Sequence, residues 1–374
     1  ENAEGNQFCD GIASVLLPQD ACREAPMVDA ALFLHTVFLP QIMYQVDRYT
    51  TASQFVAHSQ NIPTLGELLQ KIPLEEVIEA LTAKSCALDI SYDRLEFLGD
   101  AVLKLGQSDA LIRSDDNDLK RWIFCLHEGD LSSLRSAMGC NERLKDAADN
   151  ASFGEYILTQ SLGRGKWVPC GLEQYFVPDD NIESDHIISQ QTDSSPSDKV
   201  RADVVEALLG LIYLRFSYKQ AMQVAEELGI SLSQKIEPSP IQSEDSFVSG
   251  DLIALADNFL GTRKIQRTEL LREAITHPSS IHSDVPCYQR LEWIGDAVLC
   301  LAAREWVFKQ YTLPVKDLVA LETILVCNET LALLGCAAGI HKHIEHCDTS
   351  MPSRLENYEF QMKDMQQGLW GTDP

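Results

Sequence analysis

The sequence predicts an all-α protein that contains two copies of one helical domain. Apolar residues recur every three or four positions through most of the long segments, which is the spacing of one helix face. Alternating apolar and polar runs of the kind that form strands are scarce. A stretch of twelve residues also occurs twice, at 92–103 and, 196 positions later, at 288–299. These three observations favour tandem helical units.

The chain begins with a lead segment, residues 1–67, whose clearest element is a helix expected over 29–55. Pro40 inside this pattern predicts a kink, because proline removes a backbone hydrogen-bond donor and crowds the preceding turn. Two shorter helices should follow, over 65–72 and 74–81, since Leu and Ile keep the helical spacing on both sides of the proline between them.

The two copies of the repeated stretch read YDRLEFLGDAVL and YQRLEWIGDAVL. Their correspondence extends to flanking segments: EALT at 79–82 matches EAIT at 273–276, and CNE at 140–142 matches CNE at 327–329. The repeated unit is therefore a whole domain and more than a short motif.

Domain boundaries follow from the repeat and from changes in composition. The first domain should span 68–234 and the second 251–374, joined by a polar, proline-bearing linker at 235–250. Residues 171–198 contain seven Asp and Glu but neither Lys nor Arg, so this part of the first domain is expected to be a solvated, acidic insertion.

The composition of the 374 residues narrows the class of protein. An apolar content of 45% suits two domains with hydrophobic cores, and eleven cysteines without paired spacing predict reduced thiols in the cytoplasm or nucleus. We expect no membrane segment, and the missing initiator Met predicts a fragment of a longer protein. A net charge of −26 counts against nucleic-acid binding unless metal ions reverse the field locally.

Two acidic pairs carry the candidate chemistry. On a helix, Glu96 and Asp100 are four positions apart and share one face, as do Asp203 and Glu206, which are three apart. Each pair alone is commonplace on solvated helices. Together the four carboxylates would form an oxygen-rich site suited to Mg²⁺ or Mn²⁺, and such sites hydrolyse phosphodiesters with two ions.

The run at 94–103 closely resembles the signature of the ribonuclease III family, and the segment at 199–207 is similar to that family's second acidic motif. Two such domains in tandem resemble the C-terminal half of the Dicer family, and departures from animal and plant patterns favour a fungal member. The resemblance implies a pseudo-dimer within one chain. Each domain would cleave one strand of double-stranded RNA, leaving 5′-phosphate and 3′-hydroxyl ends, to make small RNAs for gene silencing and antiviral defence.

The resemblance also implies roles for single residues. Glu96, Asp100, Asp203 and Glu206 would be catalytic metal ligands, and Lys199 would contact the scissile phosphate or hold the carboxylates. In the second domain the matching catalytic metal ligands are Glu292 and Asp296. Their partner acids are expected beyond residue 374, so we expect the second domain and its site to be incomplete at the C-terminus.

Several further expectations concern partners. The substrate would be double-stranded RNA, while helicase, PAZ and double-stranded RNA-binding regions would lie outside this chain. Two chains could also pair through their first domains. The alternative function is a non-catalytic module that binds double-stranded RNA or serves a structural role while keeping the ribonuclease III fold.

Aromatic residues are expected to serve packing. Duplex RNA offers no free base faces for stacking, so the tryptophans should lie in cores or interfaces. Phe97 and Trp293 occupy the same slot of the two repeats and should pack at the junction between the domains. Trp306 has apolar neighbours and should likewise be covered.

Overall fold

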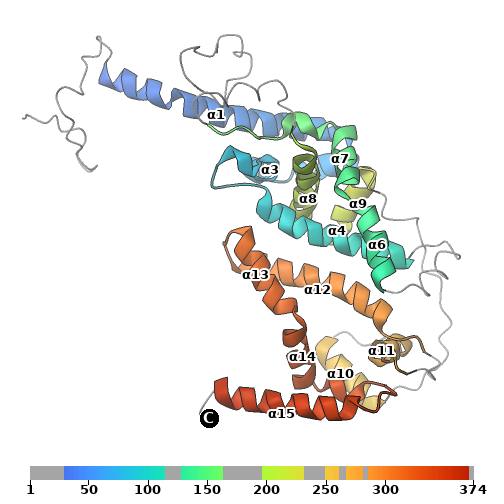
Figure 1. Ribbon diagram of the computed structural model, residues 1–374. Coiled ribbons are helices and arrows are strands. Elements are labelled where there is room, and N and C mark those ends of the chain that lie inside the picture. Colours follow the sequence, from blue (N-terminus) through green and yellow to red (C-terminus); the bar gives the residue numbers. More distant parts are fainter. Residues whose placement is uncertain are drawn as a thin grey trace, which may run out of the picture. The chain divides into compact units, whose positions relative to one another are not determined.

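The computed structural model describes residues 29–113, 128–162, 196–230, 249–260, 267–280 and 285–369. Every regular element in these ranges is a helix, apart from two isolated bridges, Thr82 with Leu158 and Thr276 with Glu345 (Figure 1). The all-α prediction is therefore confirmed. In chain order the α-helices are α1 (Ala30–His58), α2 (Pro63–Leu69), α3 (Leu74–Leu81), α4 (Asp93–Arg113), α6 (Glu128–Met138), α7 (Asn141–Asn150), α8 (Asp198–Arg215), α9 (Tyr218–Glu227), α10 (Gly250–Leu260), α11 (Thr268–Ile275), α12 (Gln289–Gln310), α13 (Val315–Val326), α14 (Asn328–Ala337) and α15 (Met351–Leu369).

Local sequence explains where several of these helices begin. Pro63 occupies the first turn of α2, where backbone N–H groups form no hydrogen bond within the helix, so the lack of an N–H in proline costs nothing there. Ser197 caps α8 by accepting a hydrogen bond from Val200 N (3.4 Å), and Ser217 caps α9 in the same way. The helix expected over 29–55 is present as α1, with Pro40 inside it.

The chain divides into two compact units. One comprises Glu1–Asp47 with Val168–Phe176, and the other comprises Arg48–Trp167 with Val177–Pro374. Both repeats lie in the second unit. The predicted boundaries at 68, 235 and 251 stay predictions, and the acidic insertion and the linker lie almost wholly outside the described residues.

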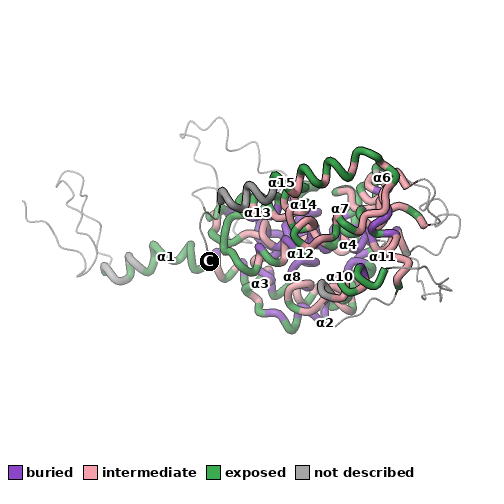
Figure 2. Tube along the Cα trace, turned by 90° about the horizontal axis from the view of Figure 1, so that it is seen from below, coloured by how far each residue is buried: buried purple, intermediate pink, exposed green. Residues whose placement is uncertain are grey.

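The core of the first repeat is built around α8, which is buried along most of its length (Figure 2). Helix α4 crosses α8 at two glycines. A Cβ on Gly99 would lie 2.6 Å from the carbonyl carbon of Glu206 and overlap its oxygen, and a Cβ on Gly210 would overlap Leu95 O. Glycine is therefore required at this crossing, which explains a residue that costs about 1 kcal/mol in a helix interior.

The second repeat is arranged like the first through its signature helix. The bridge at Thr276 matches that at Thr82, and Tyr288 N bonds Thr276 O (3.0 Å) as Tyr92 N bonds Thr82 O (2.9 Å). One face of α12 differs, however. Val298 is 51% exposed, whereas its counterpart Val102 is fully buried. Within the described ranges, no helix covers α12 as α8 covers α4.

The two signature helices, α4 and α12, pack against each other within this unit (Figure 1). Phe97 is buried against Val307 and Leu318 of the second repeat, and Trp293 is buried against Leu111 and Leu131 of the first. The prediction that both aromatics lie at the domain junction is confirmed. Such reciprocal packing is also what an intramolecular pseudo-dimer requires.

Arg94 adds polar contacts to this junction. Its guanidinium donates hydrogen bonds to Phe308 O (3.1 Å), Tyr311 O (3.0 Å) and Leu313 O (2.8 Å), and it stacks over the Phe308 ring. Phe308 lies in the last turn of α12, and Tyr311 and Leu313 follow it; helix geometry leaves carbonyl acceptors without partners at such an end.

The prediction for Trp306 was wrong, because this residue is 48% exposed. Its ring packs edge-to-face against the ring of Tyr311. It lies on α12 among apolar residues, but helical spacing alone does not say which apolar face a neighbouring helix covers.

No single described helix has the length and apolar content to cross a bilayer, although the pair Val315–Val326 and Asn328–Ala337, bent by 42°, passes that test together.

Candidate active site

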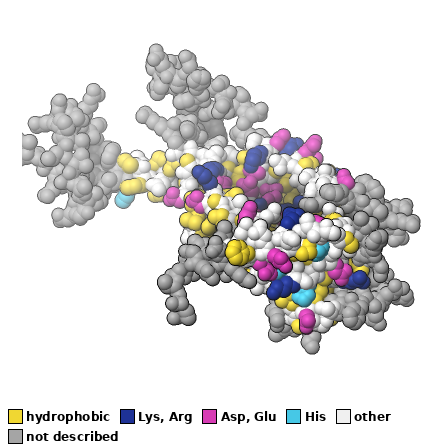
Figure 3. Space-filling view, turned by 60° about the horizontal axis from the view of Figure 1, so that its bottom comes forward, with side chains coloured by type: hydrophobic (Ala, Val, Ile, Leu, Met, Phe, Trp, Pro, Cys, Tyr) yellow, Lys and Arg dark blue, Asp and Glu magenta, His cyan; other side chains and the backbone are white. Residues whose placement is uncertain are grey.

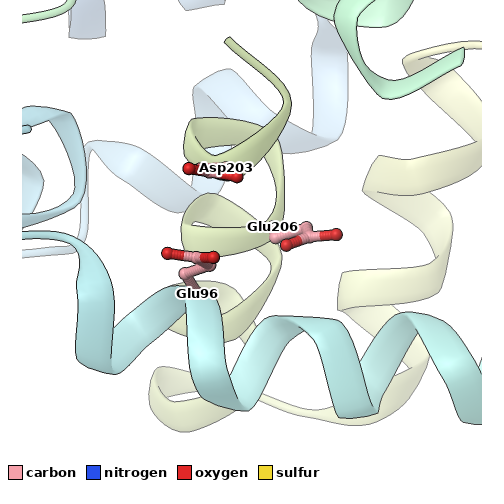
Figure 4. A group of neighbouring side chains, drawn as sticks. All are labelled: Glu96, Asp203 and Glu206. Atoms are coloured by element: carbon pink, nitrogen blue, oxygen red, sulfur yellow. The ribbon is translucent and has the colours of Figure 1, made fainter. Parts of the chain in front are cut away.

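Three carboxylates from two helices converge where α4 crosses α8 (Figure 4). Glu96 comes from α4, and Asp203 and Glu206 come from α8; one oxygen of each lies within 4.8 Å of the others. The glycine crossing brings the two backbones close enough for side chains 107 to 110 positions apart in sequence to meet. We call these three residues the acidic trio.

The trio repels itself electrostatically. Burial, reinforced by Asp100 and the rest of the trio, raises the pKa of Glu206 to about 9. Burial together with Asp203 raises the pKa of Glu96 to about 7. Carboxyl groups that resist ionisation at neutral pH indicate a site lacking enough positive charge to balance it.

Two side chains hold Asp203, which is 6% exposed. Lys199 Nζ donates to Asp203 Oδ2 at 2.8 Å and lies 3.8 Å from Glu96 Oε1. The Tyr92 hydroxyl donates to the same Asp203 oxygen at 3.1 Å, and burial and this carboxylate raise the pKa of the phenol. Lys199 therefore holds carboxylates, which is one of the two roles predicted for it.

Asp100 lies beside the trio without joining it. Its Oδ2 accepts a hydrogen bond from Arg304 Nη1 of α12 at 2.6 Å, and its side chain is 52% exposed. Of the four carboxylates predicted to share a site, three thus converge, while the fourth is turned towards a cation of the second repeat.

Comparison with known proteins identifies the family. Residues 93–217 match the model of the ribonuclease III domain, and residues 267–363 match that of a ribonuclease-III-like domain. The chain is 30% identical to Endoribonuclease Dicer homolog 1 of Oryza sativa subsp. japonica, an alignment that covers 95% of this chain. It is 29% identical to Dicer-like protein 1 of Aspergillus oryzae over 72% of the chain, and 25% identical to Protein Dicer of Schizosaccharomyces pombe over 86%.

The chain is a Dicer-like member of the ribonuclease III family. It spans about a fifth of the length of these curated relatives, with 20%, 18% and 22% of each covered. The relatives include plant and fungal proteins, so the expected fungal origin of the Dicer-like chain stays a prediction.

In the second domain of the Dicer-like chain, Glu292 and Asp296 stand on α12 at the positions of Glu96 and Asp100. Asp296 Oδ2 accepts a hydrogen bond from Lys104 Nζ of α4 at 2.8 Å. Neither residue belongs to a group of three or more metal-ligand side chains within the part of the chain that the structure describes. Their role as metal ligands stays a prediction.

The donor set of the acidic trio fits a hard divalent cation. Mg²⁺ and Mn²⁺ prefer carboxylate oxygens and keep several waters, and a bound cation would offset the burial and neighbouring acids that raise the pKa values of Glu96 and Glu206. On the face drawn in Figure 3, Asp and Glu side chains gather in a recess, with Lys and Arg at its border. The residues present could therefore hold such an ion.

Sequence reasoning missed two residues that contact these acids. Tyr92 and its counterpart Tyr288 both open the repeated stretch, so the repeat itself held a signal for Tyr92. The sequence held no signal for Arg304, because its counterpart in the first repeat is Ser108 and its contact with Asp100 spans 204 positions.

Proposed function

We propose that this chain is a divalent-metal-dependent endoribonuclease that cleaves double-stranded RNA and leaves 5′-phosphate and 3′-hydroxyl ends. The observation that carries the proposal is the acidic trio on crossed helices, in a chain with two ribonuclease III domains. In the longer parent protein, the products would be small RNAs for gene silencing and antiviral defence.

Each residue of the site has a defined task in this proposal. Mg²⁺ or Mn²⁺, when bound, supplies the Lewis acidity that generates a nucleophile from water and stabilises the leaving oxygen. Glu96 and Glu206 must lose their protons to bind such an ion, and Asp203 is held in place by Tyr92 and Lys199. Lys199 is 67% exposed on its side chain, so its ammonium can also reach a phosphate at the edge of the site.

The net charge of −26 counts against binding of RNA, but cations are present around the site. Lys199 and Arg304 form ion pairs with the acids. Lys104, Arg135 and Asp100 line a cavity of about 290 Å³. Phosphate contacts depend on such local charges. Recognition of duplex RNA would rest on A-form shape, phosphates and 2′-hydroxyls, with little dependence on sequence.

The test is cleavage of a long, end-labelled RNA duplex in Mg²⁺ by the whole chain. Glu96→Gln should lower the rate by about 100-fold or more, because loss of even an outer partner of a metal ligand typically costs about 10–100-fold. Glu292→Gln is the matched control at the same position of the second repeat, and it should leave first-site cleavage at the wild-type rate.

The alternative is a non-catalytic module that keeps the fold and binds duplex RNA. Duplex binding without Mg²⁺-dependent cleavage by the wild-type chain would favour this module and refute the nuclease proposal. Equal cleavage by wild type and Glu96→Gln would refute the assignment of the site.

Other parts of the proposal rest on sequence alone. An intracellular location, nuclear or cytoplasmic, is proposed from the cysteine usage, and the described cysteines are free thiols. Helicase, PAZ and double-stranded RNA-binding regions outside the chain stay predictions. So does pairing of two chains through their first domains, which would require α12 to leave its place on α4.

A further inference from the structure

One guanidinium of the second repeat reaches the acidic site of the first. Arg304 lies on α12, and its Nη1 donates both to Asp100 Oδ2 (2.6 Å) and to Phe97 O (2.7 Å) on α4. Its plane stacks on the Phe97 ring, with Cζ 4.6 Å from the centroid, and its Nε donates to Glu322 Oε1 at 2.9 Å. With partners on three sides, Arg304 is fixed in position whether or not Asp100 moves.

The contact between Arg304 and Asp100 adds a positive charge to a site rich in acids. Four carboxylates, the acidic trio and Asp100, face two cations that ion-pair with them in the described residues, Lys199 and Arg304. Lys199 pairs with Glu96 and Asp203, and Asp100 is the one acid of these four with which Arg304 pairs. The second repeat therefore supplies one of the two positive charges that balance the first repeat's acids before a metal ion binds.

This arrangement is not a by-product of the repeat. At the junction Lys104 pairs with Asp296, so each domain gives one cation to the other's signature aspartate. The two cations come from different positions, however, because Lys104 corresponds to Cys300, and Arg304 corresponds to Ser108. Packing of the two domains does not in itself require an arginine at 304.

We propose that Arg304 is a positioning residue that serves as the resident counter-cation of the first domain's acidic site, pairing with Asp100 and lowering the affinity of the site for divalent ions. The inference rests on the metal site proposed above. A fixed positive charge beside a carboxylate repels an incoming cation, and the repulsion is strong at short range in partly buried surroundings. The first domain would thus bind its metal with an affinity set in part by the second.

The experiment measures the Mn²⁺ dissociation constant of the whole chain by calorimetric titration. Arg304→Met should bind Mn²⁺ about tenfold more tightly than wild type, which corresponds to about 1.4 kcal/mol. Arg304→Lys keeps the charge and should stay within about twofold of wild type. Lys309→Met removes one positive charge from the same helix, where Lys309 pairs with Glu305, and should shift the constant by less than about threefold.

A merely structural arginine would behave differently, because its loss would loosen the site and weaken metal binding. An unchanged or weaker Mn²⁺ affinity in Arg304→Met would therefore overturn the proposal. So would an equal tightening in Lys309→Met, since that would reflect net charge alone.

A second variant keeps the test sound if Arg304→Met does not fold. Removing Arg304 leaves the carboxylate of Glu322, with an 11% exposed side chain, without its guanidinium. The double variant Arg304→Met with Glu322→Gln avoids that buried charge, and it should bind Mn²⁺ about tenfold more tightly than Glu322→Gln alone; equal affinities would overturn the proposal.

Failure of the metal site itself has a separate signature. If Asp203→Asn binds Mn²⁺ as well as the wild-type chain does, or if neither binds it, the proposed metal site is refuted. If Asp203→Asn abolishes Mn²⁺ binding and Arg304→Met leaves it unchanged, the counter-cation role alone is refuted.

Discussion

Substitution of Gly99 by Ala tests the helix crossing on which the acidic site depends. The methyl group would overlap Glu206 O and lie 2.6 Å from its carbonyl carbon, inside the 3.0 Å below which real Cβ atoms essentially never approach. Neither atom belongs to a flexible side chain, so α4 and α8 would have to separate. The same shift would displace Glu96 from Asp203 and Glu206, which both lie on α8.

The expected magnitude follows from two opposing effects. Alanine in a helix interior is favoured over glycine by about 1 kcal/mol. Overpacking of a core costs about 1–3 kcal/mol and occasionally more, and a forced overlap with helix backbone places the cost here at or above the top of that range. A gap of 0.5–1 Å between formerly packed atoms forfeits about a quarter to a half of their attraction. We expect a net loss of about 2–4 kcal/mol in the free energy of unfolding.

Gly295 provides a matched control within the same chain. It occupies the same position of the second repeat, in mid-helix, and an added Cβ would meet nothing within 4 Å. Gly295→Ala should therefore raise the free energy of unfolding by about 0.5–1 kcal/mol.

The assay is urea unfolding of wild type and both variants, followed by far-UV circular dichroism. The two substitutions should shift the midpoint in opposite directions. Midpoints that move together, or a neutral Gly99→Ala, would show that α4 and α8 do not cross closely and would remove the structural basis of the acidic trio.

Three other predictions concern the junction and the acids. Arg94→Met should cost about 2 kcal/mol in urea unfolding, because three carbonyl acceptors at the C-terminal end of α12 lose a half-buried charged donor. In EDTA, thermal stability should fall as pH rises from about 5 to 9, since carboxyls with raised pKa hold protons in the folded state that the unfolded chain has released; Glu206→Gln should flatten the decline above pH 7. Trp293→Phe should cost about 1 kcal/mol through the lost hydrogen bond to Ser132 (3.1 Å), whereas Trp306→Phe should stay within about 0.5 kcal/mol.

Each of these has a contradicting outcome. An unchanged free energy of unfolding in Arg94→Met would mean that water satisfies the carbonyls at the C-terminal end of α12 as well as Arg94 does. Stability that rises between pH 5 and 9 in EDTA, or a slope unchanged by Glu206→Gln, would contradict the raised carboxyl pKa values. Equal effects at the two tryptophans would contradict the difference in their burial.

The helices, the repeat and the four acids of the first domain could be predicted from the amino-acid sequence. Helical spacing of apolar residues is a local property, and so are the prolines and serines at helix starts. A repeat of twelve residues needs no structure to be seen, and acids three or four positions apart share a face of any helix. The junction positions of Phe97 and Trp293 also followed, because equivalent positions in two packed copies each face the other copy.

Which of these side chains meet depends on the packing of segments that are far apart in the sequence. Glu96 joins Asp203 and Glu206 because two glycines let helices far apart in sequence cross closely. Asp100 turns to Arg304, and Trp306 stays exposed, because each depends on which face of α12 a neighbouring helix covers. Spacing fixes the face on which a residue lies, while its partner across that face is set by packing between distant segments.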